Sequence, residues 1–136
     1  MNTDDAVAAV KSGADAIWVS NSSGRALDTL PSTISVLPSI AKVVKASNPK
    51  VDIYIDSGIR RGTDVIKALA LGASAVFLGQ PQVWGLHMAG KEGVAAVLTT
   101  ISEEFKTAMI LTDSMDVTKI TEPRVIHKLN HYHPRL

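Results

Sequence analysis

Residues 56–81 read DSGIRRGTDVIKALALGASAVFLGQP and decide the fold, because they place one helix between two polar loops. Thr63 can cap that helix, and Gly72 can end it in a left-handed turn. The apolar run ASAVFLGQ that follows predicts a buried strand at 74–79. The stretch VDIYIDSG that leads into the segment alternates and is β-branched, so it predicts a strand at 51–56. A strand, a helix and a second strand in this order indicate parallel pairing through a crossover helix.

The flanking sequence continues this alternation of strands and helices. The short apolar run ADAIWVSN predicts a further strand at 15–20. Apolar residues at helical spacing, together with helix start and stop signals, predict four more helices, at 3–13, 30–48, 91–112 and 114–120. Pro38 lies inside the second of these, so we expect a break or kink there. The βαβα order predicts an α/β fold with a parallel sheet.

A repeated frame relates two of the predicted strands. GADAIWVSN and GASAVFLGQ each place a buried strand after a helix-ending glycine, and repeated βα units build barrels. A closed barrel has eight strands and about 250 residues, so three strands indicate a partial TIM (β/α)8 barrel with two open edges. A small open α/β domain is the alternative. In a partial barrel, the strand side chains expected on the inner face are Ile17, Val19, Ile53, Ile55, and Val76 or Leu78 according to register.

Composition narrows the classes of function. The chain has 136 residues, of which 46% are hydrophobic, so it can bury a core of its own. Its formal net charge is +1 without a block of one sign, which points to no nucleic-acid partner. No apolar run reaches the roughly 18 residues of a membrane span, which points to no membrane partner. Cysteine is absent, so thiolate chemistry is excluded.

The carboxyl-terminal residues 128–136 are interpreted as a tail. Its last three residues, PRL, resemble the Ser-Lys-Leu class of peroxisomal address and predict a peroxisomal or related location. The alternative is an accidental tail and a cytoplasmic location. The histidines in HKLNHYH have spacings that could bind a metal, but we interpret them as part of the solvated tail and predict no metal site.

Polar loops follow each predicted strand, where parallel α/β folds bind ligands. The loop after residue 56 is the most informative. Gly58 and Gly62 allow close backbone approach, Arg60 and Arg61 supply charge, and a helix N-terminus follows. Together these features indicate a phosphate-type anion site, and Gly79 in the next loop could extend it. The competing interpretation is that the glycines serve only the turn and the arginines are surface charges.

Residues 56–81 resemble the carboxyl-terminal part of the FMN-dependent 2-hydroxyacid oxidases and dehydrogenases, the family of glycolate oxidase and lactate oxidase. The resemblance extends from about Thr3 to about Ile126 and covers the last three strands of that family's eight-stranded barrel. It implies an FMN cofactor and a small 2-hydroxy acid substrate. The cofactor contacts that it implies, to the phosphate and ribityl chain, are Asp56, Ser57, Gly58, Ile59, Arg60, Gly79 and Gln80.

The stretch SNSSGRALD, residues 20–28, resembles the substrate loop of the same family. The resemblance assigns Arg25 to the substrate carboxylate, and Asp28 matches the acidic end of the motif. The family's catalytic histidine falls on Ser22, whose hydroxyl cannot hold a proton near neutral pH. The chain therefore has no catalytic base at this position. Serine also replaces family glycines at two positions, and Gln80 replaces an arginine in the phosphate loop.

These comparisons of residues leave three hypotheses. Residues 1–136 are the carboxyl-terminal fragment of a 2-hydroxyacid oxidase, or one piece of a split enzyme, and are inactive alone. Alternatively, the chain is a non-catalytic homologue that still binds phosphate or flavin. In the third hypothesis it is an assembly module, whose open sheet edges self-associate or recruit a partner chain that supplies further strands.

Overall fold

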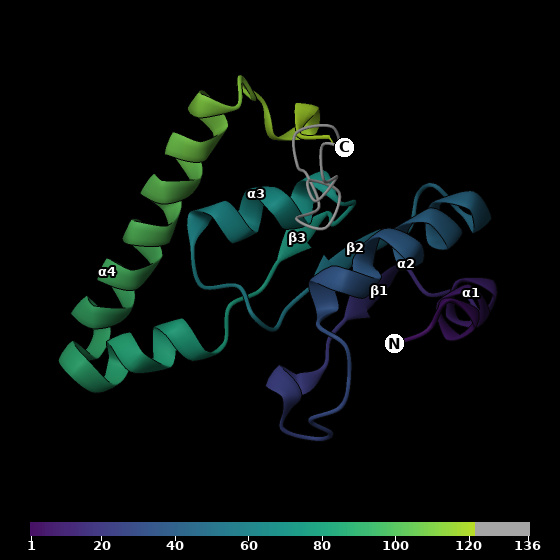
Figure 1. The fold of residues 1–136 in the computed structure, drawn as a ribbon, viewed down its shortest axis with the longest axis horizontal. Helices are drawn as coiled ribbons and strands as arrows, with labels where there is room; N and C mark the ends of the chain where they lie inside the picture. Colours follow the sequence, from purple (N-terminus) through teal and green to yellow (C-terminus); the bar gives the residue numbers. More distant parts are fainter. Residues whose placement is uncertain (122–136) are drawn as a thin grey trace, which may run out of the picture.

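The computed structural model describes residues 1–121 and consists of a small parallel sheet with helices on one side (Figure 1). The strands are paired in the order β1-β2-β3, all parallel, which confirms the predicted α/β class. Their bounds are β1 (Ala16–Val19), β2 (Asp52–Ile55) and β3 (Ala75–Val76). The helices are α1 (Thr3–Lys11), α2 (Thr33–Ser47), α3 (Gly62–Ala70) and α4 (Gln80–Leu111), with short 3-10 turns η1 (Ser22–Gly24) and η2 (Val117–Lys119).

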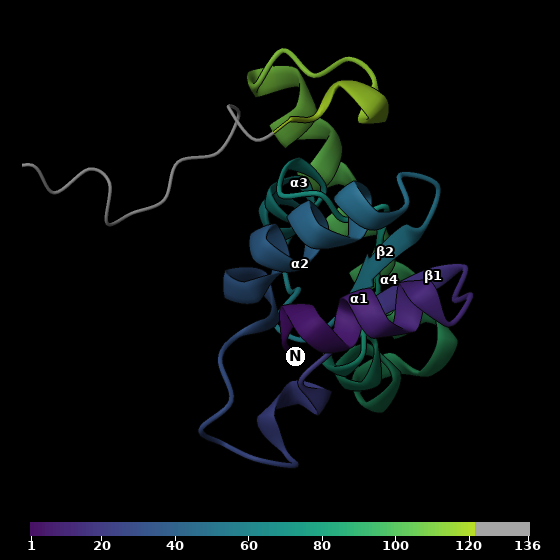
Figure 2. The same cartoon turned by 90° about the vertical axis from the view of Figure 1, so that its right-hand side faces the viewer.

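The strand register decides which face of the sheet is buried. Ile17 lies opposite Ile53, and Val19 opposite Ile55. These side chains pack with Leu37 and Val44 of α2 into the main core. Side chains alternate along a strand, so the four strand residues all lie on the helix side of the sheet. Figure 2 shows α1, α2 and α3 arranged along this side.

The prediction for the inner face was therefore wrong. The six residues assigned to it all belong to the core that the helices cover: Ile17, Val19, Ile53, Ile55, Val76 and Leu78. The opposite face instead carries an aromatic cluster, defined by Trp18, Tyr54 and Phe77. The ring centroids of Trp18 and Phe77 are 4.3 Å apart, and those of Tyr54 and Phe77 are 5.6 Å apart. Trp18 remains 54% exposed and Phe77 40% exposed.

Helix α2 continues through Pro38, where a break or kink was expected. Proline removes one helical hydrogen bond and costs about 3 kcal/mol in a helix interior. Leu37 and Val44 are fully buried on the same helix. Burial of such side chains is worth roughly 1.5–3 kcal/mol each, enough to hold the helix together across the proline.

Helix α4 begins at Gln80, eleven residues before the predicted start at 91. It consists of two arms, because Ala89 and Gly90 leave the helical conformation, Gly90 with φ of 57°. Figure 1 shows the short first arm folding back into the long second arm. A side chain at Gly85 would collide with the backbone of Gly93, so these two glycines let the arms cross closely.

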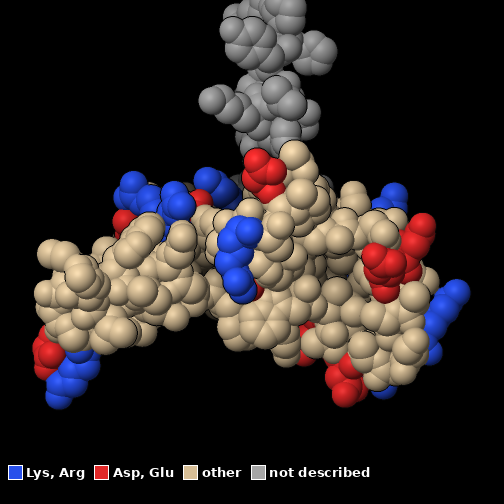
Figure 3. All heavy atoms as spheres, turned by 90° about the horizontal axis from the view of Figure 1, so that it is seen from below, with Lys and Arg blue, Asp and Glu red and all other residues tan. Residues whose placement is uncertain are grey.

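The described residues carry charges of both signs. Uncharged residues occupy most of the face shown in Figure 3, with charged side chains mainly toward its edges and a basic side chain near its middle. No helix within residues 1–121 is both long enough and apolar enough to cross a bilayer. The same residues contain no group of three metal-binding side chains. The tail at 128–136, its histidines and the PRL tripeptide lie outside the described residues.

Candidate functional site

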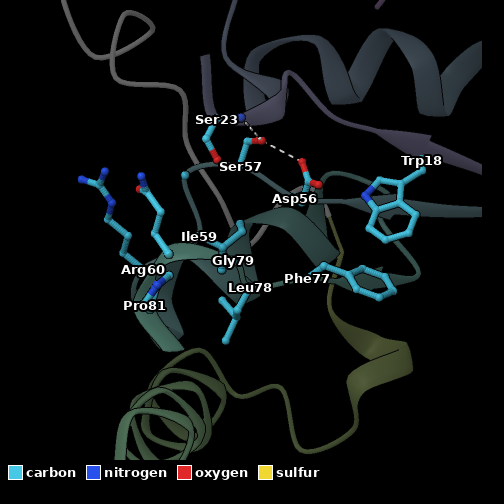
Figure 4. Close-up of a pocket in the computed structure, with 12 residues that line it drawn as sticks. Trp18, Ser23, Asp56, Ser57, Ile59, Arg60, Phe77, Leu78, Gly79 and Pro81 are labelled. Carbon is cyan, nitrogen blue, oxygen red and sulfur yellow. Dashed lines mark hydrogen bonds between the residues drawn. The ribbon is translucent and has the colours of Figure 1, made fainter. Parts of the chain in front are cut away.

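A pocket of about 200 Å³ lies at the carboxyl ends of the three strands (Figure 4). It brings together all seven residues that the resemblance implied as cofactor contacts: Asp56, Ser57, Gly58, Ile59, Arg60, Gly79 and Gln80. Five further residues complete the wall, namely Trp18, Ser23, Phe77, Leu78 and Pro81. Trp18 and Phe77 form one end of the pocket, and Arg60 and Pro81 lie at the other (Figure 4).

The loop after β2 owes its shape to two left-handed residues. Ser57 has φ of 66° and Gly58 has φ of 87°, so the chain reverses directly after the strand. Thr33, the first residue of α2, is fully buried, and its hydroxyl donates to the carbonyl oxygens of Asp56 at 2.7 Å and Ser57 at 3.0 Å. Sequence reasoning did not identify Thr33. Its only local signal was a hydroxyl residue at a helix start.

A chain of hydrogen bonds joins this loop to the loop after β1. The backbone N–H of Ser23 donates to Ser57 Oγ at 3.0 Å, and that hydroxyl donates to Asp56 Oδ1 at 2.7 Å. Figure 4 shows the two bonds crossing one side of the pocket. The arrangement holds the Asp56 carboxylate in the wall of the pocket, between its aromatic and cationic ends.

Arg25, predicted to bind the substrate carboxylate, and Ser22, at the position of the family's histidine, lie outside this pocket. Ser22 begins η1 and Arg25 follows its last residue, and both are exposed. Ser22 and Ser23 have φ of 54° and 57°, and Gly24 has φ of 74°, so three consecutive residues are left-handed. Asn21 anchors the segment by donating through Nδ2 to the carbonyl of Pro31 at 3.2 Å. Of the predicted substrate loop, only Ser23 reaches the pocket.

The N-terminus of α3 is already bound to carboxylates of the same chain. The helix begins at Gly62, with Arg61 at the cap position, and not at Thr63 as predicted. The Gly62 N–H donates to Glu104 Oε2 at 2.9 Å, and the N–H groups of Arg60 and Arg61 donate to Asp64 Oδ2 at 3.1 Å. The prediction that this helix start helps to bind an external anion was therefore wrong, because carboxylates of the same chain already accept from these N–H groups.

Arg61 and Glu104 form an ion pair with an N···O distance of 2.8 Å. The hydrogen bond from the Arg61 guanidinium, followed by that from the Gly62 N–H, holds the pKa of Glu104 below its ordinary value. The same pair raises the pKa of Arg61. Arg61 therefore has a structural role between α3 and α4 and does not line the pocket.

The N-terminus of α4 differs from that of α3, because no carboxylate of the described residues is bonded to it. Gly79 is its cap residue, Pro81 lies in its first turn, and that turn contains no acidic side chain. Backbone N–H groups at such a helix start attract anions. Arg60 has no carboxylate partner within residues 1–121, and its guanidinium lies 5.9 Å from the ring centroid of Trp84. The pocket thus ends in a corner lined by the Arg60 side chain and by Gly79 and Gln80 at the N-terminus of α4.

Comparisons with known proteins agree with this arrangement. Residues 1–127 match the family model described as FMN-dependent dehydrogenase. The chain is 49% identical over 125 residues to 2-hydroxyacid oxidase 1 of Mus musculus, covering 92% of this chain and 33% of the relative. It is 40% identical over 136 residues to a peroxisomal (S)-2-hydroxyacid oxidase of Arabidopsis thaliana, covering all of this chain and 37% of that relative.

Solved structures lead to the same family. The fold superposes on mandelate oxidase with benzoyl-formic acid with a TM-score of 0.84 and 40% sequence identity, covering 90% of this chain and 36% of that one. The chain thus spans about a third of the length of these relatives, as the prediction of a partial barrel required. On the match of residues 1–127, the chain belongs to the FMN-dependent dehydrogenase family.

Proposed function

We propose that the chain is the carboxyl-terminal third of a 2-hydroxyacid oxidase-type barrel, which keeps the site for the FMN phosphate but is inactive alone. The observation that carries this proposal is that Arg60 lines the pocket beside Gly79 and Gln80, the cap and the first residue of α4. A guanidinium beside a helix N-terminus whose first turn has no acidic side chain suits a phosphate monoester.

The residues of the pocket fit part of an FMN molecule. FMN has an aromatic ring system at one end and a phosphate at the other, and the pocket has aromatic side chains at one end and Arg60 at the other. Its volume of about 200 Å³ is below the about 300–1,000 Å³ of sites for whole ligands of that size. The described residues therefore form part of the wall of a flavin site, and further strands would supply the rest.

The proposal assigns roles to several residues of the pocket. Arg60 and the N–H groups of the first turn of α4 bind the phosphate, and Gly58 lets the backbone approach the ligand. The Asp56 carboxylate accepts hydrogen bonds from ribityl hydroxyls, held in place by Ser57. Bound FMN would supply the redox chemistry by accepting the electrons of the alcohol. Arg25 lies outside the pocket, on the exposed loop after β1, and in this proposal it binds the carboxylate of a small 2-hydroxy acid.

The proton transfer of this reaction has no donor or acceptor at Ser22. A serine hydroxyl is too weak a base to accept and hold a proton near neutral pH, and loss of a general base typically costs about 10²–10⁴ in rate. With glycolate or lactate, the chain is therefore expected not to reduce added FMN. Bleaching of flavin absorbance at the rate of an ordinary flavin oxidase would contradict this part of the proposal.

A binding experiment tests the phosphate site directly. FMN and riboflavin share the ring system and ribityl chain and differ in the phosphate, so both are titrated with the full chain while flavin fluorescence is recorded. A charge-assisted hydrogen bond worth about 1.5–3 kcal/mol predicts a preference for FMN of about tenfold or more. Arg60→Ala should remove most of this preference, and Lys50→Ala, at the other end of β2, should not. Equal affinities for FMN and riboflavin in the parent chain would refute the site.

We also propose a role in assembly, which the aromatic cluster favours. β1 and β3 are the edge strands of the described sheet, and Trp18 and Phe77 leave large apolar areas exposed on its open face. Apolar surface and unpaired strand edges both favour association. Association with further barrel strands, from a second copy or a partner chain, would bury the apolar surface and pair the strand edges.

We propose a peroxisomal location, based on the terminal PRL tripeptide and on the peroxisomal relative from Arabidopsis thaliana. Residues 122–136 fused to the carboxyl end of a fluorescent protein provide the test. Punctate peroxisomal fluorescence that is lost on removal of Leu136 supports the address. Diffuse fluorescence from both fusions would contradict it.

A further inference from the structure

Two neighbouring arginines on the loop before α3 have opposite kinds of partner. Arg61 is paired with the Glu104 carboxylate at 2.8 Å. Arg60 instead lies with its guanidinium carbon 5.9 Å from the ring centroid of Trp84, on the first arm of α4. The distance is within the about 6 Å over which an aromatic face attracts a cation. The charge of Arg61 is therefore used within the fold, whereas the charge of Arg60 remains available to a ligand.

The choice of an aromatic partner has a chemical consequence. A carboxylate would neutralise the guanidinium and use its N–H edge, as Glu104 does with Arg61. An indole face attracts the cation while leaving its charge and its planar N–H edge available to a ligand. Arg60 is exposed, so without Trp84 its side chain would sample many rotamers.

The position of Trp84 couples Arg60 to the helix start. Trp84 follows Pro81 by three residues, so both lie on one face of the first turns of α4. Both line, with Arg60, a hollow of about 330 Å³ between the arms of α4 that adjoins the pocket. Arg60 and Pro81 line the pocket itself as well, and Figure 4 shows them at the same end of it.

We infer that Trp84 is a positioning residue, which holds the Arg60 guanidinium beside the N-terminus of α4 without neutralising it and thereby raises affinity for a phosphate group. The inference deepens the proposed function and rests on it. Trp84 does not line the pocket, so it acts through Arg60 and not through contact with the ligand.

The binding test is a double-mutant cycle on Trp84 and Arg60. For each variant the measured quantity is the ratio of its FMN affinity to its riboflavin affinity. Trp84→Leu should lower this ratio two- to fivefold, the range expected for an exposed cation–π contact, and Trp84→Phe should retain most of it. In an Arg60→Ala background, Trp84→Leu should change nothing further. An equal loss of FMN and riboflavin affinity, or an undiminished effect without Arg60, would overturn the inference.

A ligand-free measurement separates this inference from the proposed function. Trp18 and Trp84 are the two tryptophans of the chain, so Trp18→Phe leaves Trp84 as the only indole emitter. In that background, Arg60→Met should shift the emission of Trp84 and raise its quenching by acrylamide, whereas Lys50→Met should not. Unchanged Trp84 emission and quenching would overturn the inference. A changed signal with equal FMN and riboflavin affinity would instead refute the phosphate site, and with it the effect on phosphate affinity, while supporting the Arg60–Trp84 contact.

Discussion

Ser23 and Ser57 are hydrogen-bonded across two loops, with the Ser23 N–H donating to Ser57 Oγ at 3.0 Å. Both residues are left-handed, with φ of 57° and 66°. A residue other than glycine costs about 1–2 kcal/mol in this conformation. The Ser57 hydroxyl offsets part of that cost by joining the loops after β1 and β2 and by donating to Asp56. The family resemblance implies glycine at both positions, so this bridge is a feature of the present chain.

Ser57→Ala and Ser57→Gly should separate strain from hydrogen bonding. Alanine keeps the left-handed strain and loses both hydrogen bonds of the hydroxyl, so it should lower the free energy of unfolding by about 1–2 kcal/mol. Glycine loses the same bonds but relieves the strain, so it should lie within about 0.5 kcal/mol of the parent. Urea unfolding measures both. A glycine variant less stable than the alanine variant would show that strain is unimportant here.

Gly62→Ala should destabilise the contact between α3 and α4. A Cβ at this position would collide with the backbone of Glu104 and Phe105, which cannot move without displacing the second arm of α4. Overpacking of this kind typically costs about 1–3 kcal/mol. The matched control is Thr63→Ala, one residue further along the same helix and exposed. Equal melting temperatures for the two variants would contradict the close approach.

The ion pair of Arg61 and Glu104 should make stability depend on acid pH. Because its pKa is lowered in the folded chain, ionised Glu104 contributes stability that is fully present above its unfolded pKa. That contribution is lost as the pH falls through the folded value. Glu104→Gln should therefore flatten the decline in melting temperature below about pH 5. Glu103→Gln, whose carboxylate pairs with Lys106 on the exposed side, is the control and should leave the decline almost unchanged.

Gln80→Arg should strengthen binding of FMN relative to riboflavin. Gln80 lines the pocket at the first residue of α4, so a guanidinium there would add a second cation beside Arg60. One added charge-assisted contact predicts an increase of several-fold to about tenfold in the FMN affinity alone. Gln82→Arg adds the same charge outside the pocket and controls for a general effect of net charge. Equal gains from both variants would rule out a specific contact at Gln80.

The open aromatic face should make the chain self-associate or bind further strands. Light scattering at micromolar concentration should give a mass above the 14.5 kDa of one chain. Trp18→Ser and Phe77→Ser should reduce that association, because each removes apolar area from the face. Leu111→Ser changes an 81% exposed apolar residue at the end of α4 and should not. A single 14.5 kDa species with a cooperative melt and no dye-accessible apolar surface would contradict this expectation.

The strands that would complete a barrel can be taken from a relative and tested for binding to the present chain. Mouse 2-hydroxyacid oxidase 1 without its matched third would provide the rest of a barrel, and co-expression with the present chain tests complementation. Co-purification that depends on Trp18 and Phe77 would identify the aromatic face as part of the contact. If the two chains purify together equally well with the serine variants, the contact lies elsewhere.

The sequence by itself determined the strands, their parallel order and the loops that carry the site. These features follow from local patterns: β-branched runs form strands, glycines end helices, and polar residues follow the strands. Parallel strands place their carboxyl ends at one edge, so the meeting of the loops after β2 and β3 could be predicted. The family resemblance then implied the individual residues of the pocket, Asp56–Arg60 with Gly79 and Gln80.

The tertiary structure decided which partners those residues meet. Glu104 lies more than 40 residues from Arg61, and only the packing of α4 on α3 brings it to the helix start that we expected to bind an external anion. The alternation of β2 predicted two faces but not which one the helices cover, so Ile53 and Ile55 were assigned to the wrong side. Local periodicity fixes the spacing of side chains along a strand or helix. The choice of contact between distant segments depends on how all the helices share the surface of the sheet, a property of the whole packed chain.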